Sequence, residues 1–247
     1  MATGKNVAVK NESTAVAIPD FLRERMNDQR GSEEVEAQDL VIPRIELIQG
    51  LSKARKKSEA AYIEGADEGM LYNNVTRELY GESLKFVPVY FRKEWLLWRD
   101  INKGGGFGGA FPDEDSAQAA LDTMEVPGEW EVIDTNQHFV LVIKEDGSIE
   151  EAVISMAKTK AKASRLLNSL VRINGGPRFS RVYELSGVPD TNKAGQDFHS
   201  LSVKNVGFVT AEQFAHAEAV YELVKSGAAT VDRSTDDLDG DLDDAGM

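Results

Sequence analysis

One helix pattern, at residues 157–173, separates two groups of strand-like segments. The run Asn-Gly-Gly-Pro at residues 174–177 stops this helix. The strand-like segments are rich in β-branched and aromatic residues and lie at 84–100, 138–144 and 149–156 before the helix and at 178–188 and 197–209 after it. A second helix pattern begins at Thr210 and ends at Gly227. The chain therefore runs strand, strand, strand, helix, strand, strand, helix.

This order predicts an α+β protein. A five-stranded antiparallel barrel with a helix between its third and fourth strands, the OB-fold arrangement, has the same order, so we expect an OB-like barrel. A different α+β sheet is the alternative, because one sequence does not fix the strand count. Pro88 predicts an edge position or a bulge in its strand. The five glycines between 104 and 109 predict a mobile loop, and Asp115 or Ser116 is the expected cap of a short helix after it.

Three regions are expected along the chain. Residues 1–38 lack the apolar periodicity that offsets ordering entropy, which predicts a flexible N-terminal arm. Residues 39–228 form the OB-like domain, with the aliphatic segment 39–51 docked on it. Residues 229–247 are expected to be a disordered acidic tail.

The composition excludes several kinds of chemistry. No cysteine is present among the 247 residues, so a disulfide framework, a thiolate metal site and a cysteine nucleophile are excluded. The sequence shows neither an apolar run of about 18 residues nor a secretory leader, and a cytoplasmic protein is expected. His138, His199 and His216 are far apart in sequence. We therefore expect no enzyme activity, no cofactor and no metal, with a metal-dependent DNA-processing enzyme that uses dispersed carboxylates as an alternative.

Charge is distributed unevenly. The chain carries a net charge of −14, and residues 232–247 alone hold seven aspartates and one arginine. In contrast, residues 152–183 contain no acidic residue and seven basic ones: Lys158, Lys160, Lys162, Arg165, Arg172, Arg178 and Arg181. Acidic proteins normally avoid nucleic acid, because phosphate binding depends on lysine and arginine. Because of the basic segment, the net charge of the whole chain is a misleading guide to nucleic-acid binding.

The helix at 157–173 is amphipathic at about 100° per residue. One narrow stripe holds Lys158, Lys162, Arg165 and Arg172. The opposite side holds Ala163, Leu166, Leu167, Leu170 and Val171. An ordinary surface helix of so acidic a chain would carry glutamates as i,i+4 partners of its lysines. Their absence favours an anion-binding ridge over a plain solvated face.

The strand after this helix adds aromatic residues. Alternate strand residues share a face, so Phe179, Arg181 and Tyr183 are expected to project together. Stacking on exposed aromatics is worth about 1 to 3 kcal/mol per base in single strands. The alternative is a core Phe179 and Tyr183 with Arg181 at the rim. The full predicted nucleic-acid site is Lys158, Lys160, Lys162, Arg165, Arg172, Arg178, Phe179, Arg181 and Tyr183.

These features resemble the single-stranded DNA-binding proteins of bacteria and tailed bacteriophages. The resemblance covers residues 84–209 by architecture and residues 232–247 by composition, and the segments "DLVIPRIELIQGL", "LKFVPVYFRKEWLLWRD" and "ISMAKTKAKASRLLNSL" are similar to a phage replication or recombination group. In the bacterial family the tail ends in an aromatic residue, whereas this chain ends in Ala245, Gly246 and Met247. That departure argues against docking of partners through the tip of the tail.

The resemblance implies a protein that coats single-stranded DNA without strong sequence preference and protects it. It also implies recruitment of replication or recombination proteins, and competition with DNA, by the acidic tail residues Asp236, Asp237, Asp239, Asp241, Asp243 and Asp244. A homo-oligomer is compatible with this function. A protein-interaction module, or an acidic mimic of nucleic acid that inhibits another protein, is the alternative.

Overall fold

Residue 30, residues 42–192 and residues 194–227 are described in the computed structural model of the chain. The predicted tail, residues 229–247, and all of the predicted arm except Arg30 lie outside the described residues. The predictions made for those two segments therefore stay predictions.

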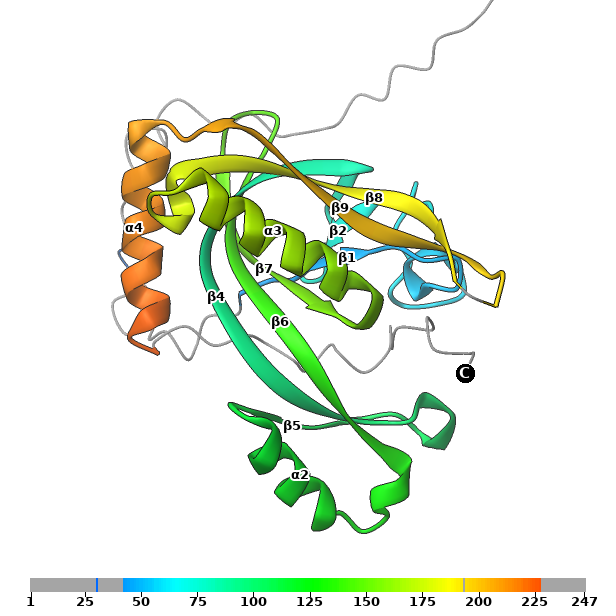
Figure 1. The fold of residues 1–247 in the computed structure, drawn as a ribbon. Coiled ribbons are helices and arrows are strands. Elements are labelled where there is room, and N and C mark those ends of the chain that lie inside the picture. The colour runs from blue at the N-terminus through cyan, green and yellow to red at the C-terminus, as the bar shows by residue number, and fades with distance from the viewer. Residues whose placement is uncertain (1–29, 31–41, 193, 228–247) are drawn as a thin grey trace, which may run out of the picture. The chain divides into compact units, whose positions relative to one another are not determined.

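The described chain is α+β, as predicted, and its main sheet is antiparallel (Figure 1). Five strands form it in the order β7-β6-β4-β8-β9. Their bounds are Ser83–Arg99 for β4, Trp130–Ile143 for β6, Ile149–Ala157 for β7, Arg181–Thr191 for β8 and Asp197–Phe208 for β9. A sixth strand, β5 at Phe107–Phe111, pairs with the end of β4. The strand-like segments 138–144 and 149–156 lie in β6 and β7, which form a hairpin whose ladder runs from Ile143 opposite Ile149 to Thr135 opposite Ala157.

The predicted bulge is also confirmed. Pro88 lies in β4, the central strand, and the register with β6 shifts between Pro88 and Tyr90. Proline has no N–H to donate, so a central strand accommodates it at a bulge.

The expected OB-like barrel is not closed within the described residues. β7 and β9 are the two edges of the sheet, and no described residue of one pairs with the other. The segment from Pro43 to Gln49 reaches both edges instead. The Val153 N–H of β7 donates to the Pro43 carbonyl at 2.8 Å. The Gln49 side chain exchanges two hydrogen bonds with the backbone of His199 in β9, at 2.7 and 2.9 Å.

A small second sheet forms around this segment. It consists of β1 at Ile45–Leu47, β2 at Leu71–Asn73 and β3 at Leu79–Gly81. Ile45, Leu47 and Leu71 are buried in the main core, which confirms that the aliphatic segment docks on the domain. The docked segment forms hydrogen bonds with backbone N–H and C=O groups of β7 and β9, which those strands would otherwise offer to each other.

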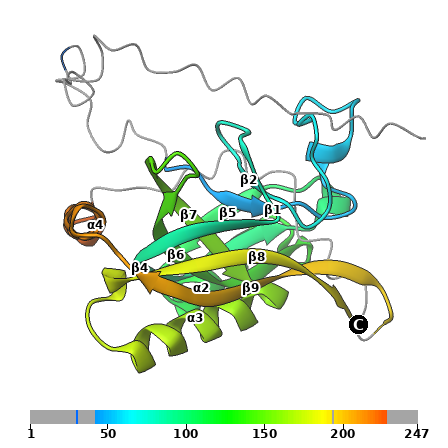
Figure 2. The same ribbon diagram turned by 90° about the horizontal axis from the view of Figure 1, so that it is seen from above.

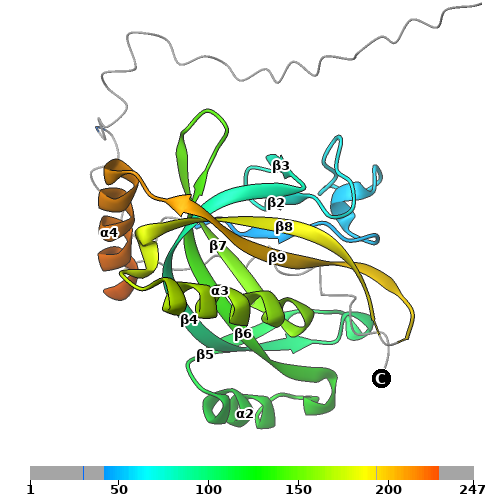
Figure 3. The same ribbon diagram turned by 45° about the horizontal axis from the view of Figure 1, so that its top comes forward.

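Two helices cover opposite faces of the curved main sheet. α3, Ala161–Asn174, packs Ala163 and Leu167 into the core that also holds β1. Figure 2 shows α3 and the β1–β2 pair on either side of the β8–β9 pair. α4, Ala211–Lys225, packs Val220 and Val224 into a second core on the other face (Figure 3).

Local sequence explains where these helices begin and end. A capping box between Thr210 and Gln213 begins α4. α3 ends at Gly175, whose φ of 66° suits a residue without a Cβ. None of the helices in the described part of the chain is long and apolar enough to cross a membrane.

β4 and β6 continue beyond the rest of the sheet as a long ribbon, joined at its end by β5 and by α2, Glu114–Asp122 (Figure 1). The predicted mobile loop is wrong in its second half, because Phe107–Phe111 forms β5. A Cβ on Gly108 would lie 2.8 Å from the Trp130 ring, so glycine permits this close packing. The cap of α2 is Asp113, whose carboxylate accepts from the Ser116 N–H, and not Asp115 or Ser116.

Candidate nucleic-acid interface

The outer face of α3 carries three exposed basic side chains, Lys162, Arg165 and Arg172. Their spacing of three and seven residues places them on one side of the helix, as predicted. Among the described residues, no acidic side chain forms an ion pair with any of the three. Their positive charges are therefore not neutralised by the described fold and face the solvent.

Two large apolar side chains lie among these charges. Leu166 is 44% exposed and Ile173 is 79% exposed. The prediction that Leu166 lies on the side of the helix opposite the cations is wrong, because the buried positions are Ala163, Ser164 and Leu167 and Leu166 lies one step around the helix from Leu167. We call the set Lys162, Arg165, Leu166, Arg172 and Ile173 the α3 surface.

Three other predicted phosphate ligands are buried or paired with side chains of the fold. Lys160 is only 8% exposed, which corrects its prediction as a surface cation. The Lys158 ammonium lies 3.0 Å from the Glu131 carboxylate on β6. The Arg178 guanidinium donates to His138 Nδ1 at 2.8 Å. Burial of Arg178 lowers its pKa to about 10.

His138 joins three elements beneath the α3 surface. Because Nδ1 accepts from Arg178, the neutral ring carries its proton on Nε2 and donates to Ser164 Oγ at 2.8 Å. Burial, with a smaller contribution from the Arg178 charge, lowers the pKa of His138 to about 3. The Phe91 ring lies beside His138 and under the Arg178 guanidinium. This neutral histidine holds α3 and the following turn on β6.

The two predicted stacking aromatics are buried. Phe179 is 7% exposed and packs on Phe214 and Tyr221 of α4. Tyr183 is 0% exposed and its hydroxyl accepts from the Asn174 side chain at 3.3 Å. The prediction of one shared face is wrong because residues 178–180 form a 3-10 turn, so the strand begins only at Arg181. Phe179 and Tyr183 are therefore core residues, which was the alternative to base stacking.

An exposed aromatic that the sequence analysis missed lies beside Arg181. Phe208 is opposite Arg181 in the β8–β9 ladder and is 72% exposed. The Arg181 guanidinium carbon is 4.2 Å from the centre of its ring. Gly207 within a strand pattern was the signal that pointed to an irregularity here.

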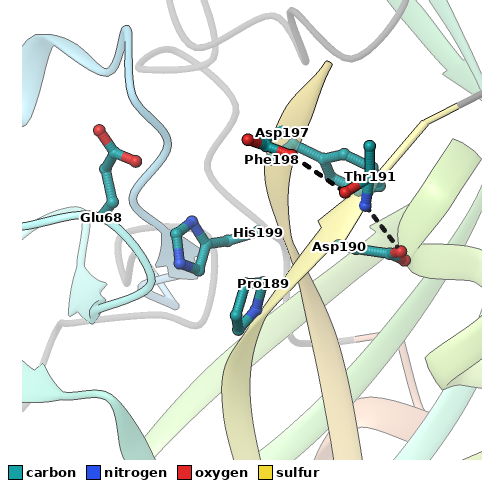
Figure 4. A pocket seen from close by; sticks show the side chains of 7 residues that line it. All are labelled: Glu68, Pro189, Asp190, Thr191, Asp197, Phe198 and His199. Carbon is teal, nitrogen blue, oxygen red and sulfur yellow. Dashed lines mark hydrogen bonds between the residues drawn. The ribbon is translucent and has the colours of Figure 1, made fainter. Parts of the chain in front are cut away.

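The described surface also contains an open pocket of about 330 Å³ beside the β8–β9 hairpin (Figure 4). Its lining is Glu68, Pro189, Asp190, Thr191, Asp197, Phe198 and His199. The Asp197 carboxylate accepts from the Thr191 hydroxyl at 3.0 Å. Three carboxylates repel phosphate, so this pocket is a poor site for nucleic acid. Within the described ranges, no group of three or more histidine, aspartate and glutamate side chains is placed to hold a metal ion.

A family model described as "Pam3 phage gp34-like protein" matches residues 10–230. No curated protein and no solved structure matches the chain. The match includes every element of the described fold.

Proposed function

We propose that this chain, which belongs to the Pam3 phage gp34-like protein family, binds single-stranded DNA through its α3 surface without strong sequence preference. The observation that carries the proposal is the exposed, unpaired positive charge of Lys162, Arg165 and Arg172 in a chain of net charge −14. Such a cluster binds phosphates through release of counterions, and it needs no base-specific contact. The proposed function is binding alone, without enzyme activity.

The strand order supports the fold part of the proposal. α3 lies between the third and fourth strands of the sequence β4, β6, β7, β8, β9, as in an OB-like domain. We interpret the sheet as an OB-like sheet that is open between β7 and β9, with residues 43–49 in the opening. The β5 and α2 ribbon is an addition to that arrangement.

The proposal is tested by fluorescence anisotropy with labelled oligo(dT), duplex DNA and oligo(U) at low salt. The expected result is binding of the single strand that weakens as salt rises, with weaker binding of the duplex. No binding of oligo(dT) at low salt would refute the proposal. Equal affinity for oligo(U) would extend it to RNA.

The acidic tail is proposed to compete with DNA for the α3 surface and to recruit replication or recombination proteins. Its six clustered aspartates, Asp236, Asp237, Asp239, Asp241, Asp243 and Asp244, are tethered to the domain and so are present at a high effective concentration. Competition requires that their charge, and not the length of the chain, weakens DNA binding. A full-length variant with these aspartates changed to asparagine separates the effect of charge from the effect of length. It should bind DNA more tightly than the wild type if the charge is responsible.

A protein partner is the second candidate, and the exposed Leu166 and Ile173 favour it. A partner helix with acidic and apolar residues on one face would complement the α3 surface. A pull-down that recovers such a partner, combined with no response to any oligonucleotide, would favour this candidate.

A further inference from the structure

Phe208 is unusual among the large side chains of the described sheet because it is 72% exposed at the end of β9. Single exposed apolar residues are common on protein surfaces and need no explanation. Phe208 differs because the backbone is arranged to bring it out of the core, and because its ring already holds a cation.

A β-bulge decides the direction of Phe208. In the β8–β9 ladder Tyr183 is opposite Asn205, whereas its neighbour Val182 is opposite Gly207, so Val206 is an extra residue in β9. Val203 faces the core beneath α3. In a regular strand residues 203, 205 and 207 would share that face and Phe208 would point to the α4 side. The extra residue reverses the alternation and puts Phe208 on the α3 side, opposite Arg181.

Arg181 ties the ring to the α3 surface. One of its guanidinium nitrogens donates to the carbonyl of Asn174, the last residue of α3, at 3.4 Å. The same guanidinium lies over the Phe208 ring at 4.2 Å. Arg172 and Ile173 directly precede Asn174 and are exposed. The aromatic ring therefore lies next to the C-terminal end of the row of cations.

We propose that Phe208, held by Arg181, is a platform on which one nucleobase of the bound strand stacks. This inference rests on the proposed function. It names Phe208 as the residue that makes the protein selective for single-stranded over duplex DNA. Among the described side chains, only Arg181 makes a cation–π or ring contact with Phe208, so most of the ring remains open to a ligand. Bases in a duplex are paired and stacked on one another, and they do not offer a face to the ring.

The test compares oligo(dT) with an abasic oligonucleotide of equal length, which has the same phosphates and no bases. Wild-type protein should bind oligo(dT) more tightly than the abasic strand. Phe208→Leu keeps an apolar side chain and removes the ring. It should weaken oligo(dT) binding by roughly 5-fold to 150-fold, which corresponds to the cost of losing one stacked base, and leave abasic binding unchanged.

Two further variants complete the experiment. Phe208→Trp should keep the preference for oligo(dT), because it restores a stacking ring. Leu223→Ala is the matched control: Leu223 is 39% exposed, but it lies on α4, which packs on the other face of the sheet. That control should bind both oligonucleotides like the wild type.

Each unfavourable outcome identifies what has failed. Wild-type protein that binds neither oligonucleotide overturns the proposed function. Wild-type protein that binds oligo(dT) with an affinity unchanged in Phe208→Leu overturns the platform and leaves the function intact. An equal loss for both oligonucleotides assigns Phe208 a structural role. A dimer that Phe208→Leu dissociates in sedimentation shows that a second copy covers the ring, which also overturns the platform.

Discussion

The salt dependence of binding follows directly from how the structure treats the basic residues. Each phosphate contact to a single strand contributes about −0.7 to the slope of log K against log salt. Seven contacts would give a slope of about −5. The structure removes three of the seven basic residues, because Lys160 is buried, Lys158 pairs with Glu131 and Arg178 is bonded to His138. Four remain, so we expect a slope of about −2.8 and a loss of about 50-fold between about 50 and 200 mM salt.

The perturbation is the triple change of Lys162, Arg165 and Arg172 to glutamine. It leaves Arg181 as the one remaining contact of the four, so the slope should fall to about −0.7 and the loss over the same salt range to about 3-fold. The matched control changes three exposed lysines outside α3 to glutamine: Lys56, Lys57 and Lys103. Its net charge equals that of the triple α3 variant. Anisotropy titrations with oligo(dT) measure both slopes. A triple variant that keeps the wild-type slope, or a control that loses it, would refute the assignment of phosphates to α3.

Three other predictions follow from burial and charge. Leu167→Ala should lower the free energy of unfolding by about 2 to 5 kcal/mol in urea titrations, because Leu167 is fully buried, whereas Leu166→Ala should change it by less than about 1 kcal/mol. Burial lowers the pKa of His138 from about 6.5 in the unfolded chain to about 3 in the folded one. Its contribution to stability is therefore lost as pH falls below about 6, at about 1.4 kcal/mol per unit, and His138→Gln should flatten the measured slope by that amount. Deletion of residues 232–247 should tighten oligo(dT) binding at low salt, and an unchanged or weaker affinity would exclude tail competition.

Much of the fold was accessible from local patterns. Thr210 and Gly175 mark the start of α4 and the end of α3, and Pro88 marks a bulge, because capping, positive φ and a missing N–H are properties of single residues. Local patterns did not show whether the expected OB-like barrel is open or closed. Its closure depends on whether β7 pairs with β9 or with residues 43–49, and that choice is between contacts far apart in sequence.

The candidate site shows the same division. Helical periodicity placed Lys162, Arg165 and Arg172 together, and the structure agrees. It did not show that Lys160 is buried or that Leu166 is exposed, because periodicity says which side chains share a face and not how wide the covered face is. Arg178 was indistinguishable from a surface arginine until His138, 40 residues away in sequence, was seen to accept its hydrogen bond.

The sequence by itself determined the order of the five main strands with α3 and α4, the acid-free segment and the unequal charge of the chain, since these depend on residue type and spacing alone. Only the tertiary structure decided which charges are exposed and which aromatic is available to a ligand. Phe179 and Tyr183 entered two cores on opposite faces of the sheet. One extra residue in β9 turned Phe208 to the α3 side, because a shift of one position in a strand reverses every side chain beyond it.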